Sequence, residues 1–343
     1  MLARRRLTYL LDWTLLLLFT FVLVRPLLKA KYLDLWGSIE STFIADARFL
    51  RDHWIHPNWQ PNWYCGTRTD YVYPPALRYG TAAIMKMVPA VIPAKAYHLY
   101  VGFFYCFGIA AVYLFTRWGS GSRLWGIVAA VATAIISPSY LLLPTLRDTT
   151  AWHTPYRYFV LTQYGEGPHM TALAWLPVAL LFCFRAMQAW RPGSLALAAI
   201  ACAFVVSNNF YGATALAMLF PILAWSIYVT HRDSWMWVRA VAIAILAYGL
   251  TAFWLVPSYI DLTIANMRFV SSQGNVWSAW VALLTVIGFV LLSDRFARGK
   301  REAAYLVFTC GALAAFLVNV VGHFYFNFRI IGNLPGSCPS WTG

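Results

Sequence analysis

Long uninterrupted runs of apolar residues dominate the chain and restrict its fold more than any other feature. Eight of these runs approach the roughly 20 apolar residues that a helix needs to cross a bilayer. A ninth run, residues 195–206, is shorter. Open sheet edges do not survive in lipid, so we interpret the runs as helices. The longer runs are residues 9–28, 97–115, 125–143, 170–184, 211–229, 238–255, 277–292 and 303–320. The sequence predicts an all-α polytopic membrane protein with about nine transmembrane helices.

The composition agrees with a membrane protein. Charged residues make up 11% of the chain and hydrophobic residues 61%, whereas soluble domains contain about 25% charged residues. The first run follows three arginines, as in a signal peptide, but Asp12 and Trp13 interrupt its start, and no small-residue cleavage site follows Val24. We therefore expect an uncleaved anchor in which Asp12 pairs with a partner inside the helix bundle.

Basic residues lie in short loops on alternate sides of the apolar runs. A net charge of +14 would fit a nucleic-acid-binding protein, but the positions of the charges follow the positive-inside rule instead. With a cytoplasmic N-terminus all the basic loops face inward, provided that residues 195–229 cross twice. The loop residues are Arg4, Arg5, Arg6, Arg117, Arg123, Arg185, Arg191, Arg232, Arg239, Arg295, Arg298, Lys300 and Arg301. We predict an integral protein of a bacterial inner (plasma) membrane that contacts membrane lipids and binds no nucleic acid.

This orientation places the unusual segments on the outer side. They are the first extracytoplasmic loop, residues 29–95, and the outer segments 144–169, 207–212 and 257–275. In the first loop, apolar residues from Leu35 to Leu50 recur at helical spacing with polar residues between them, which predicts an amphipathic helix on the membrane surface. Residues 81–92 are apolar but short, which favours a re-entrant or surface helix. Function is therefore expected on the outer face.

Two acidic residues of the first loop are the catalytic candidates. Asp34 falls on the first turn of the predicted surface helix, and Glu40 lies six residues later on a different helical face. A carboxylate in this place can serve as a general base or as a metal ligand. The alternative is a structural carboxylate that favours the positive end of a helix.

Four other outer residues are candidates for substrate binding. Glu166 and His169 stand at the start of the 170–184 run, where an ionisable group either faces a protein cavity or caps a helix. Arg157 and Arg268 are flanked by aromatic residues. A guanidinium suits a phosphate or diphosphate, although interfacial arginines also simply extend toward the headgroups.

Two further segments carry candidates. Asn209 lies in a tight turn, where it either hydrogen-bonds a polar ligand or forms the turn. Residues 53–75 hold more aromatic rings than an interfacial belt needs, on a backbone stiffened by proline. Trp59, Trp63 and Tyr64 are therefore predicted to stack on the apolar face of a sugar or to form a structural lid, and the two roles are compatible. No metal site is assigned from residue spacing.

Several motifs resemble a known group of proteins. The segments LDLWGSIE, HPNWQPNWYCGTRTDYVYPP, GEGPHMTALAWLPVALL, NNFYGATALA and FWLVPSYIDLTIANMRFVSSQGNVWS are similar to large bacterial and archaeal membrane proteins described as 6-pyruvoyl-tetrahydropterin synthase-related. The similarity extends over nearly the whole chain, to about residue 333. More loosely, the order of an anchor, a long outer loop with an acidic residue and a bundle of many spans resembles the GT-C superfamily of membrane glycosyltransferases.

The resemblance implies a GT-C-like transmembrane domain over residues 1–333. It implies a membrane glycosyltransferase that uses a polyprenyl-phosphate-linked sugar donor on the outer face of the membrane. In GT-C enzymes an acidic residue of the first outer loop acts as base or metal ligand, a role that would fall on Asp34 and then on Glu40. A divalent metal ion is the cofactor this implies, but the loop lacks Asp-x-Asp and any adjacent acidic pair. Zinc and pterin chemistry do not carry over, because no three-histidine site is present.

The end of the chain departs from the pattern that precedes it. Residues 334–343 form a polar tail unlike the preceding pattern, and members of the group are longer, so we expect a truncated or frameshifted copy.

A lipid or solute transporter is one alternative function. It would need polar groups near the middle of the membrane, of which the sequence offers few. A non-catalytic envelope assembly protein is the other, favoured by the missing acidic pair.

Overall fold

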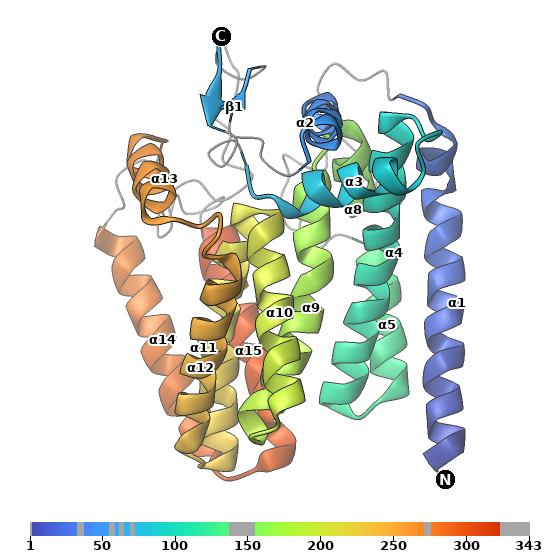
Figure 1. Ribbon diagram of the computed structural model, residues 1–343. Coiled ribbons are helices and arrows are strands. Elements are labelled where there is room, and N and C mark those ends of the chain that lie inside the picture. The colour runs from blue at the N-terminus through green and yellow to red at the C-terminus, as the bar shows by residue number, and fades with distance from the viewer. Residues whose placement is uncertain are drawn as a thin grey trace. The chain divides into compact units, whose positions relative to one another are not determined.

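The computed structural model describes residues 2–32, 38–54, 59–61, 65–68, 73–136, 155–270 and 276–322 (Figure 1). Within these ranges the chain is all-α apart from one hairpin of two short antiparallel strands. The chain divides into two compact units. Unit 1 comprises Met1–Ala179 and Ala201–Ala213, and unit 2 comprises Leu180–Ile200 and Thr214–Gly343.

Helices form nearly all of both units. Unit 1 contains α1 (Leu2–Lys29), α2 (Glu40–Asp52), β1 (Trp59–Gln60), β2 (Thr67–Arg68), α3 (Ala76–Met87), α4 (Pro93–Ser120), α5 (Arg123–Ile135) and α8 (Tyr156–Gln163). Three helices contribute to both units: α9 (Gly167–Gln188), α10 (Pro192–Asn208) and α11 (Phe210–His231). Unit 2 also contains α12 (Trp235–Thr251), α13 (Pro257–Val270), α14 (Val276–Ala297), the 3₁₀ turn η2 (Arg301–Ala303), α15 (Ala304–Phe316) and the π-helical turn η3 (Leu317–Val321).

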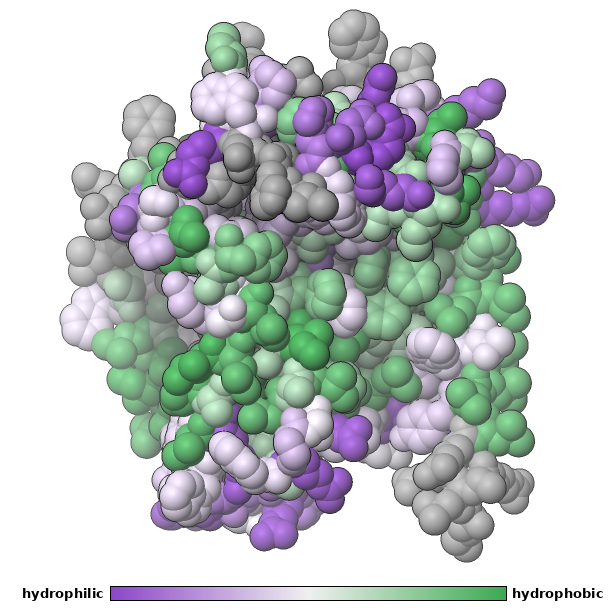
Figure 2. Space-filling model, in the orientation of Figure 1, coloured by the Kyte–Doolittle hydropathy of each residue, from purple (hydrophilic) through white to green (hydrophobic). Residues whose placement is uncertain are grey.

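The helices confirm that the chain is a polytopic membrane protein. Six segments of the described residues are long and apolar enough to cross a membrane: Leu7–Lys29, Pro93–Ser120, Gly167–Gln188, Phe210–His231, Trp277–Ala297 and Arg301–Asn319. Three shorter apolar helices, α5, α10 and α12, overlap the other three predicted runs; residues 137–143 of the predicted 125–143 run lie outside the described residues. Apolar side chains cover the middle of the helices, and hydrophilic side chains gather at the helix ends (Figure 2). This distribution suits a bilayer, whose core accepts apolar groups and whose surfaces accept polar ones.

The core of unit 1 forms around one face of α4. Tyr97, Val101, Tyr105, Ile109 and Tyr113 are buried at every fourth position, which places them in a continuous ridge along the helix. The ridge packs against buried residues of α1 and α5, among them Leu16, Val24, Leu27, Ala130 and Ala134. In lipid the packing of side chains, rather than water exclusion, holds helices together. The phenol of Tyr105 satisfies its donor by bonding the Ala134 carbonyl at 3.2 Å.

Asp12 pairs inside the bundle, as predicted. Its carboxylate accepts hydrogen bonds from Tyr113 Oη at 2.6 Å, Arg117 Nη1 at 2.9 Å and Arg123 Nε at 2.8 Å. Arg117 also donates to the Tyr113 hydroxyl, and its Nη2 donates to the Thr8 hydroxyl at 3.0 Å. The guanidinium of Arg117 lies over the ring of Tyr9. Only 2% of the Asp12 side chain is exposed, so this network fixes one end of α1 to α4 and α5.

Helices α2 and α3 lie across the opposite end of α4 (Figure 1). They pack on each other and on α4 through small and apolar side chains, namely Ala47, Leu50, Ala82, Met85 and Ala96. Helix α3 begins at Ala76 and ends at Met87, five residues before the end of the predicted 81–92 segment. Pro89 explains the earlier end, because the residue before a proline avoids the helical conformation, and Val88 is non-helical here with φ of −127° and ψ of 80°.

The amphipathic helix predicted from Leu35 onward needs two corrections. Residues 38 and 39 are not helical, and the helix begins at Glu40. The backbone N–H of Ile39 donates to the Tyr164 carbonyl at 3.0 Å, which holds this residue outside the helix. Glu40 and Asp46 were expected on the polar face, but both are buried. Glu40 contacts His98, and Asp46 accepts a hydrogen bond from Gln60 at 2.9 Å.

Unit 2 has a core of its own. Val229 of α11, Ala297 of α14 and Val307 of α15 are buried together, with Trp225 and Phe289 packed against them. The indole of Trp225 donates to the Ser293 hydroxyl at 2.9 Å, which satisfies the polar atom of a large side chain inside this core. Helix α14 therefore lies against α11 and α15 within unit 2.

Candidate functional site

Polar and ionisable side chains gather in unit 1 at the end of α4 that α2 and α3 cover. We call this set the polar cluster. It consists of Glu40, Tyr73, Tyr97, His98, Arg157, Glu166, His169, Asn208 and Asn209. The Asp12 network lies at the other end of α4. His98 and Arg117 are separated by about 28 Å along the helix at 1.5 Å per residue, which is close to the thickness of the hydrocarbon core. The polar cluster thus lies at one membrane boundary of unit 1 and the Asp12 network at the other.

The Glu40–His98 pair is a buried part of the polar cluster. The Glu40 Oε2 atom lies 3.2 Å from His98 Nε2, and the side chains are 5% and 0% exposed. Among the described residues, the other ring nitrogen of His98, Nδ1, makes no hydrogen bond. Glu40 was predicted as a catalytic carboxylate, whereas His98 was not predicted at all. Its signal in the sequence was an ionisable residue at the edge of an apolar run, next to a tyrosine.

The backbone before α9 is in close contact with the backbone at the start of α2, and we call this contact the joint. Gly165 adopts a left-handed conformation with φ of +71°, and its carbonyl accepts a hydrogen bond from Tyr97 Oη at 3.0 Å. A Cβ atom at Gly165 would lie 2.4 Å from the Glu40 backbone nitrogen and 2.6 Å from Ser38 Oγ. The joint therefore depends on a glycine, and it sets the position of Glu40 relative to α9.

Substituting Gly165 by alanine should destabilise the fold by more than backbone strain alone. Gly121 has nearly the same left-handed φ, +69°, but open space around its Cα, so Gly121→Ala reports the strain without the clash. We expect Gly165→Ala to cost about 1–3 kcal/mol more than Gly121→Ala, because the neighbouring atom is backbone and cannot rotate away. Thermal unfolding in detergent, followed by tryptophan fluorescence, measures the difference. Equal midpoints for the two variants would show that the close approach is not made.

Arg157 is a buried cation at the membrane boundary. It lies on α8, within electrostatic range of His169 and Tyr105. Its Nε atom is buried and, within the described part of the chain, makes no hydrogen bond. Burial lowers the pKa of the guanidinium from its ordinary value, yet an arginine keeps its charge in proteins. A desolvated guanidinium with an unused donor is an incomplete ion pair, which an anion would complete.

Glu166 and His169 both lie where the sequence predicted them, at the start of α9. Glu166 precedes the helix, and its carbonyl accepts the Met170 N–H at 3.1 Å. Its carboxyl is half-buried, and burial raises the pKa of Glu166 above its ordinary value. The His169 ring packs edge-on against Tyr211, with 6.1 Å between centroids.

The raised pKa of Glu166 predicts a specific pH dependence of stability. Folding favours the neutral carboxyl, so its contribution is fully present below the ordinary glutamate pKa, about 4.3, and is lost as the pH rises through the raised value. Glu166→Gln stays neutral throughout. We expect this variant to unfold at the same temperature as wild type at the acidic end of that window and at a higher temperature above it. The exposed Glu302 provides the control, because Glu302→Gln should show no such divergence. Parallel curves for Glu166→Gln and wild type would refute the prediction.

Two asparagines at the end of α10, Asn208 and Asn209, form hydrogen bonds that hold another part of the polar cluster. Asn208 Oδ1 accepts from the Thr171 hydroxyl at 2.8 Å, and its amide nitrogen donates to the Phe204 carbonyl at 2.7 Å. Asn209 is 1% exposed; its amide nitrogen donates to the Tyr73 hydroxyl at 2.7 Å and its Oδ1 accepts the Tyr211 N–H. Asn209, predicted either to bind a polar ligand or to form the turn, therefore holds Tyr73, the last tyrosine of the aromatic loop (residues 53–75), at the end of α10.

The aromatic loop is described in part. Trp59 lies in β1 opposite Arg68 of β2, and its side chain is 56% exposed. A Cβ at Gly66 would lie 2.3 Å from the Trp59 ring, so the ring packs closely against this backbone. Trp59 therefore has an exposed surface, which the predicted stacking on a sugar requires. Tyr73 packs edge-on against Phe43 of α2, which attaches the end of the loop to the surface helix.

The structure brings together some of the predicted site residues and leaves others untested. Glu40, Arg157, Glu166, His169 and Asn209 all fall in the polar cluster of unit 1. Asp34, Trp63 and Tyr64 lie outside the described residues. Arg268 lies on α13 in unit 2, and its side chain is outside the described part. Tyr73, Tyr97 and His98 belong to the polar cluster but were not predicted as site residues.

The described residues do not form a metal site. No group of three or more His, Cys, Asp or Glu side chains comes together within them. The pair of Glu40 and His98 is held together by a contact of 3.2 Å between Oε2 and Nε2.

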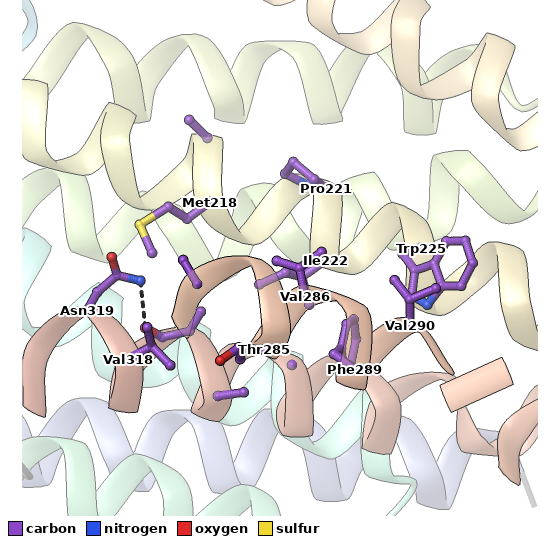
Figure 3. Close-up of a pocket in the computed structure, with 15 residues that line it drawn as sticks. Met218, Pro221, Ile222, Trp225, Thr285, Val286, Phe289, Val290, Val318 and Asn319 are labelled. Carbon is purple, nitrogen blue, oxygen red and sulfur yellow. Dashed lines mark hydrogen bonds between the residues drawn. The ribbon is translucent and has the colours of Figure 1, made fainter. Parts of the chain in front are cut away.

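Unit 2 contains an apolar cavity of about 450 Å³ between α11, α14, α15 and η3 (Figure 3). Met218, Pro221 and Trp225 of α11 face Val286 and Phe289 of α14 across it. Asn319 of η3 also lines the cavity; its amide nitrogen donates to the Ala315 carbonyl at 2.8 Å, and its Oδ1 is buried without a partner among the described residues. The size and lining suit a hydrocarbon chain with a hydrogen-bond donor.

In comparisons with known proteins, no family model matches the chain and no curated protein matches it.

Proposed function

We propose that the chain is a GT-C-like membrane glycosyltransferase. It transfers a sugar from a polyprenyl-phosphate-linked donor to an acceptor hydroxyl on the outer face of a bacterial inner membrane. The observation that carries the proposal is Arg157, a buried guanidinium whose Nε has no hydrogen-bond acceptor among the described residues. It lies at the membrane boundary, where the phosphate of a lipid-linked donor resides.

The surroundings of Arg157 favour a phosphate over other anions. The prenyl chain of the donor stays in the bilayer, so its phosphate meets the protein at the depth of the membrane boundary. Arg157 offers a planar set of donors that matches phosphate oxygens. His169 lies within electrostatic range and can donate a hydrogen bond to the same group. Among the described residues no carboxylate forms an ion pair with Arg157, and its Nε donor is unused.

The proposed reaction uses these side chains as follows. The acceptor hydroxyl attacks the anomeric carbon of the donor sugar, and the bond from that carbon to the phosphate oxygen breaks. Asp34, the base proposed from the sequence, takes the hydroxyl proton. Arg157 holds the leaving polyprenyl phosphate, whose charge increases as the bond breaks. Trp59, with Trp63 and Tyr64 of the same loop, stacks on the sugar.

Glu40 and Arg268 have secondary roles in this proposal. Glu40 was a second candidate for the base, but its carboxylate is buried against His98. We assign it to holding the start of α2, six residues after Asp34, rather than to the proton transfer. Arg268, which lies in unit 2, is the alternative to Arg157 for holding the donor phosphate.

The proposed topology has nine transmembrane helices and a cytoplasmic N-terminus. It takes the six long segments and the three shorter apolar helices α5, α10 and α12 as crossings. In unit 1 it is supported by the distribution of charge. Arg117 and Arg123 bind Asp12 at one end of α4, where the positive-inside rule expects them, and the polar cluster lies at the other end.

Transfer from a labelled donor tests the proposal. The purified chain is assayed in liposomes with a panel of radiolabelled polyprenyl-phosphate sugars. We expect Arg157→Gln to lower kcat/KM by about 100- to 1,000-fold, the usual loss when a donor to a developing anion is removed. The same substitution removes an unpaired buried charge, so the unfolding midpoint should stay the same or rise. Lower activity without lower stability distinguishes a ligand-binding arginine from a structural one.

Two outcomes oppose the proposal. Wild type that transfers no sugar from any donor in the panel, although it is folded, would end the enzyme assignment. An Arg157→Gln variant as active as wild type would remove Arg157 from the site. Arg51→Gln is the matched control, since Arg51 is exposed and paired with Asp52 at 2.8 Å, and its activity should equal that of wild type.

The apolar cavity of unit 2 supports a second candidate, a lipid-handling protein. Transport of a lipid requires a site for its hydrocarbon chain within membrane-spanning helices, and the cavity lies between three such helices. A non-catalytic assembly protein requires neither the cavity nor an unpaired Arg157. Movement of a fluorescent prenyl phosphate between leaflets of a reconstituted vesicle, without sugar transfer, would favour the lipid-handling function.

A further inference from the structure

The Asp12 network contains more positive charge than negative charge. Two guanidinium groups, those of Arg117 and Arg123, share the single carboxylate of Asp12. Arg117 is buried, whereas 54% of the Arg123 side chain is exposed. Arg123 donates to Asp12 through Nε and Nη2, at 2.8 and 2.6 Å. Among the described residues we find no acceptor for its remaining donors, so the excess charge is presented at an accessible guanidinium.

Arg123 stands at the end of an apolar groove between α1 and α5. On α5 the groove is lined by Arg123, Ile127, Val131 and Ile135, which follow one another at every fourth position and so form one ridge of the helix. On α1 it is lined by Asp12 and by an apolar face that includes Leu16 and Phe19. Both helices pack on α4, and the groove between them has a volume of about 350 Å³.

The aromatic residues near Arg123 place it at the level of the lipid headgroups. Trp125, two residues further along the chain, is 62% exposed, and Trp118 at the end of α4 is 36% exposed. Tryptophan collects at the boundary between hydrocarbon and water. From this boundary the α5 ridge runs toward the middle of the membrane. A ligand that fills the groove therefore has a polar end beside Arg123 and an apolar body along Ile127, Val131 and Ile135.

We propose that this groove binds an anionic phospholipid. Its phosphate accepts hydrogen bonds from Arg123, and one acyl chain lies along the α5 ridge against α1. A negative headgroup neutralises the charge that Asp12 leaves uncompensated, which a headgroup of zero net charge cannot do. Basic pockets between transmembrane helices at the cytoplasmic side are typical sites for such lipids, and the basic loops place Arg123 on that side in the proposed topology. The site is separate from the polar cluster and does not depend on the proposed enzyme activity.

Native mass spectrometry of the detergent-purified chain tests the proposal. The protein is titrated with dioleoylphosphatidylglycerol and, separately, with dioleoylphosphatidylcholine, and the apparent Kd of the first bound lipid is measured. We expect the phosphatidylglycerol Kd to be about fivefold lower, the effect of one arginine at a membrane surface. Arg123→Gln should bring the two Kd values together, while Asp12 keeps its bonds to Tyr113 and Arg117.

A second variant and a control keep the result unambiguous. Val131→Trp fills the groove without changing its charge, and it should raise the Kd for both lipids. Arg191→Gln removes an exposed arginine from another loop and should leave the fivefold preference intact. Equal Kd values for the two lipids in wild type would overturn the proposal. So would loss of the preference in Arg191→Gln, which would reveal a diffuse effect of net charge, or unchanged binding in Val131→Trp.

Discussion

Substituting Asp12 by asparagine is expected to lower the free energy of unfolding by about 3–5 kcal/mol, the usual result when one partner of a buried ion pair is removed. Asparagine keeps the shape of the side chain but loses its charge, so the buried guanidinium of Arg117 has no counter-ion. The amide nitrogen would also face the donors of Arg117, Arg123 and Tyr113. The unfolding midpoint in detergent should fall by roughly 5–10 °C.

A surface carboxylate provides a matched control for Asp12. Asp294 also serves two arginines, Arg232 at 3.5 Å and Arg298 at 3.7 Å, but its side chain is 36% exposed. Asp294→Asn should change stability by less than about 1 kcal/mol, as exposed ion pairs do. Adding Arg117→Met to Asp12→Asn should restore much of the loss, because no buried charge then lacks a partner. If Asp12→Asn is no more destabilising than Asp294→Asn, the network does not hold α1 in place.

Substituting Glu40 by alanine is expected to cost about 3 kcal/mol, since it leaves a fully buried histidine without its partner. Both ring nitrogens of His98 would then lack hydrogen bonds to the described residues, because Nδ1 has none in the native chain. Glu40→Gln retains an oxygen near His98 Nε2 and should cost less than half as much. Chemical denaturation of the purified chain gives both values under the same conditions.

A double substitution separates the pair from its surroundings. Replacing Glu40 and His98 together by leucine removes both polar groups, so the double variant should be more stable than Glu40→Ala. Glu302→Ala, at an exposed carboxylate, sets the baseline for the loss of a charge. The prediction is wrong if Glu40→Ala unfolds at the same denaturant concentration as Glu302→Ala.

The membrane fold was predictable because it depends on local sequence. Six of the apolar runs form helices with the length that a bilayer requires, and a run of that kind has few alternatives to a helix. The boundaries were harder. The surface helix begins at Glu40 and not near Leu35, because the N–H of Ile39 bonds the carbonyl of Tyr164, a residue far away in the sequence. The spacing of apolar and polar residues within the helix carries no information about that hydrogen bond.

The sequence indicated several members of the polar cluster but not the contacts between them. Glu166 and His169 could be found because ionisable residues at the edge of an apolar run are costly and so need a reason to be there, and Arg157 because aromatic residues flank it. The pairing of Glu40 with His98 joins residues 58 positions apart, and that of Asn209 with Tyr73 joins residues 136 positions apart. Spacing along the chain reveals neither pairing, since only the packing of α2 and α10 near α4 and α9 brings the partners together. Asp12 was the exception, because a lone carboxylate in a membrane helix has to find a cation.

The π-helical turn η3 absorbs an extra residue without changing the direction of the side chains beyond it. A turn of this kind accommodates one residue more than an α-helix does over the same rise. Deleting one residue between Leu317 and Val321 would therefore restore ordinary α-helical geometry, and the side chains before and after the turn would keep their relative orientation. A one-residue deletion within α15 would instead rotate the part of the helix beyond it by about 100° about the axis.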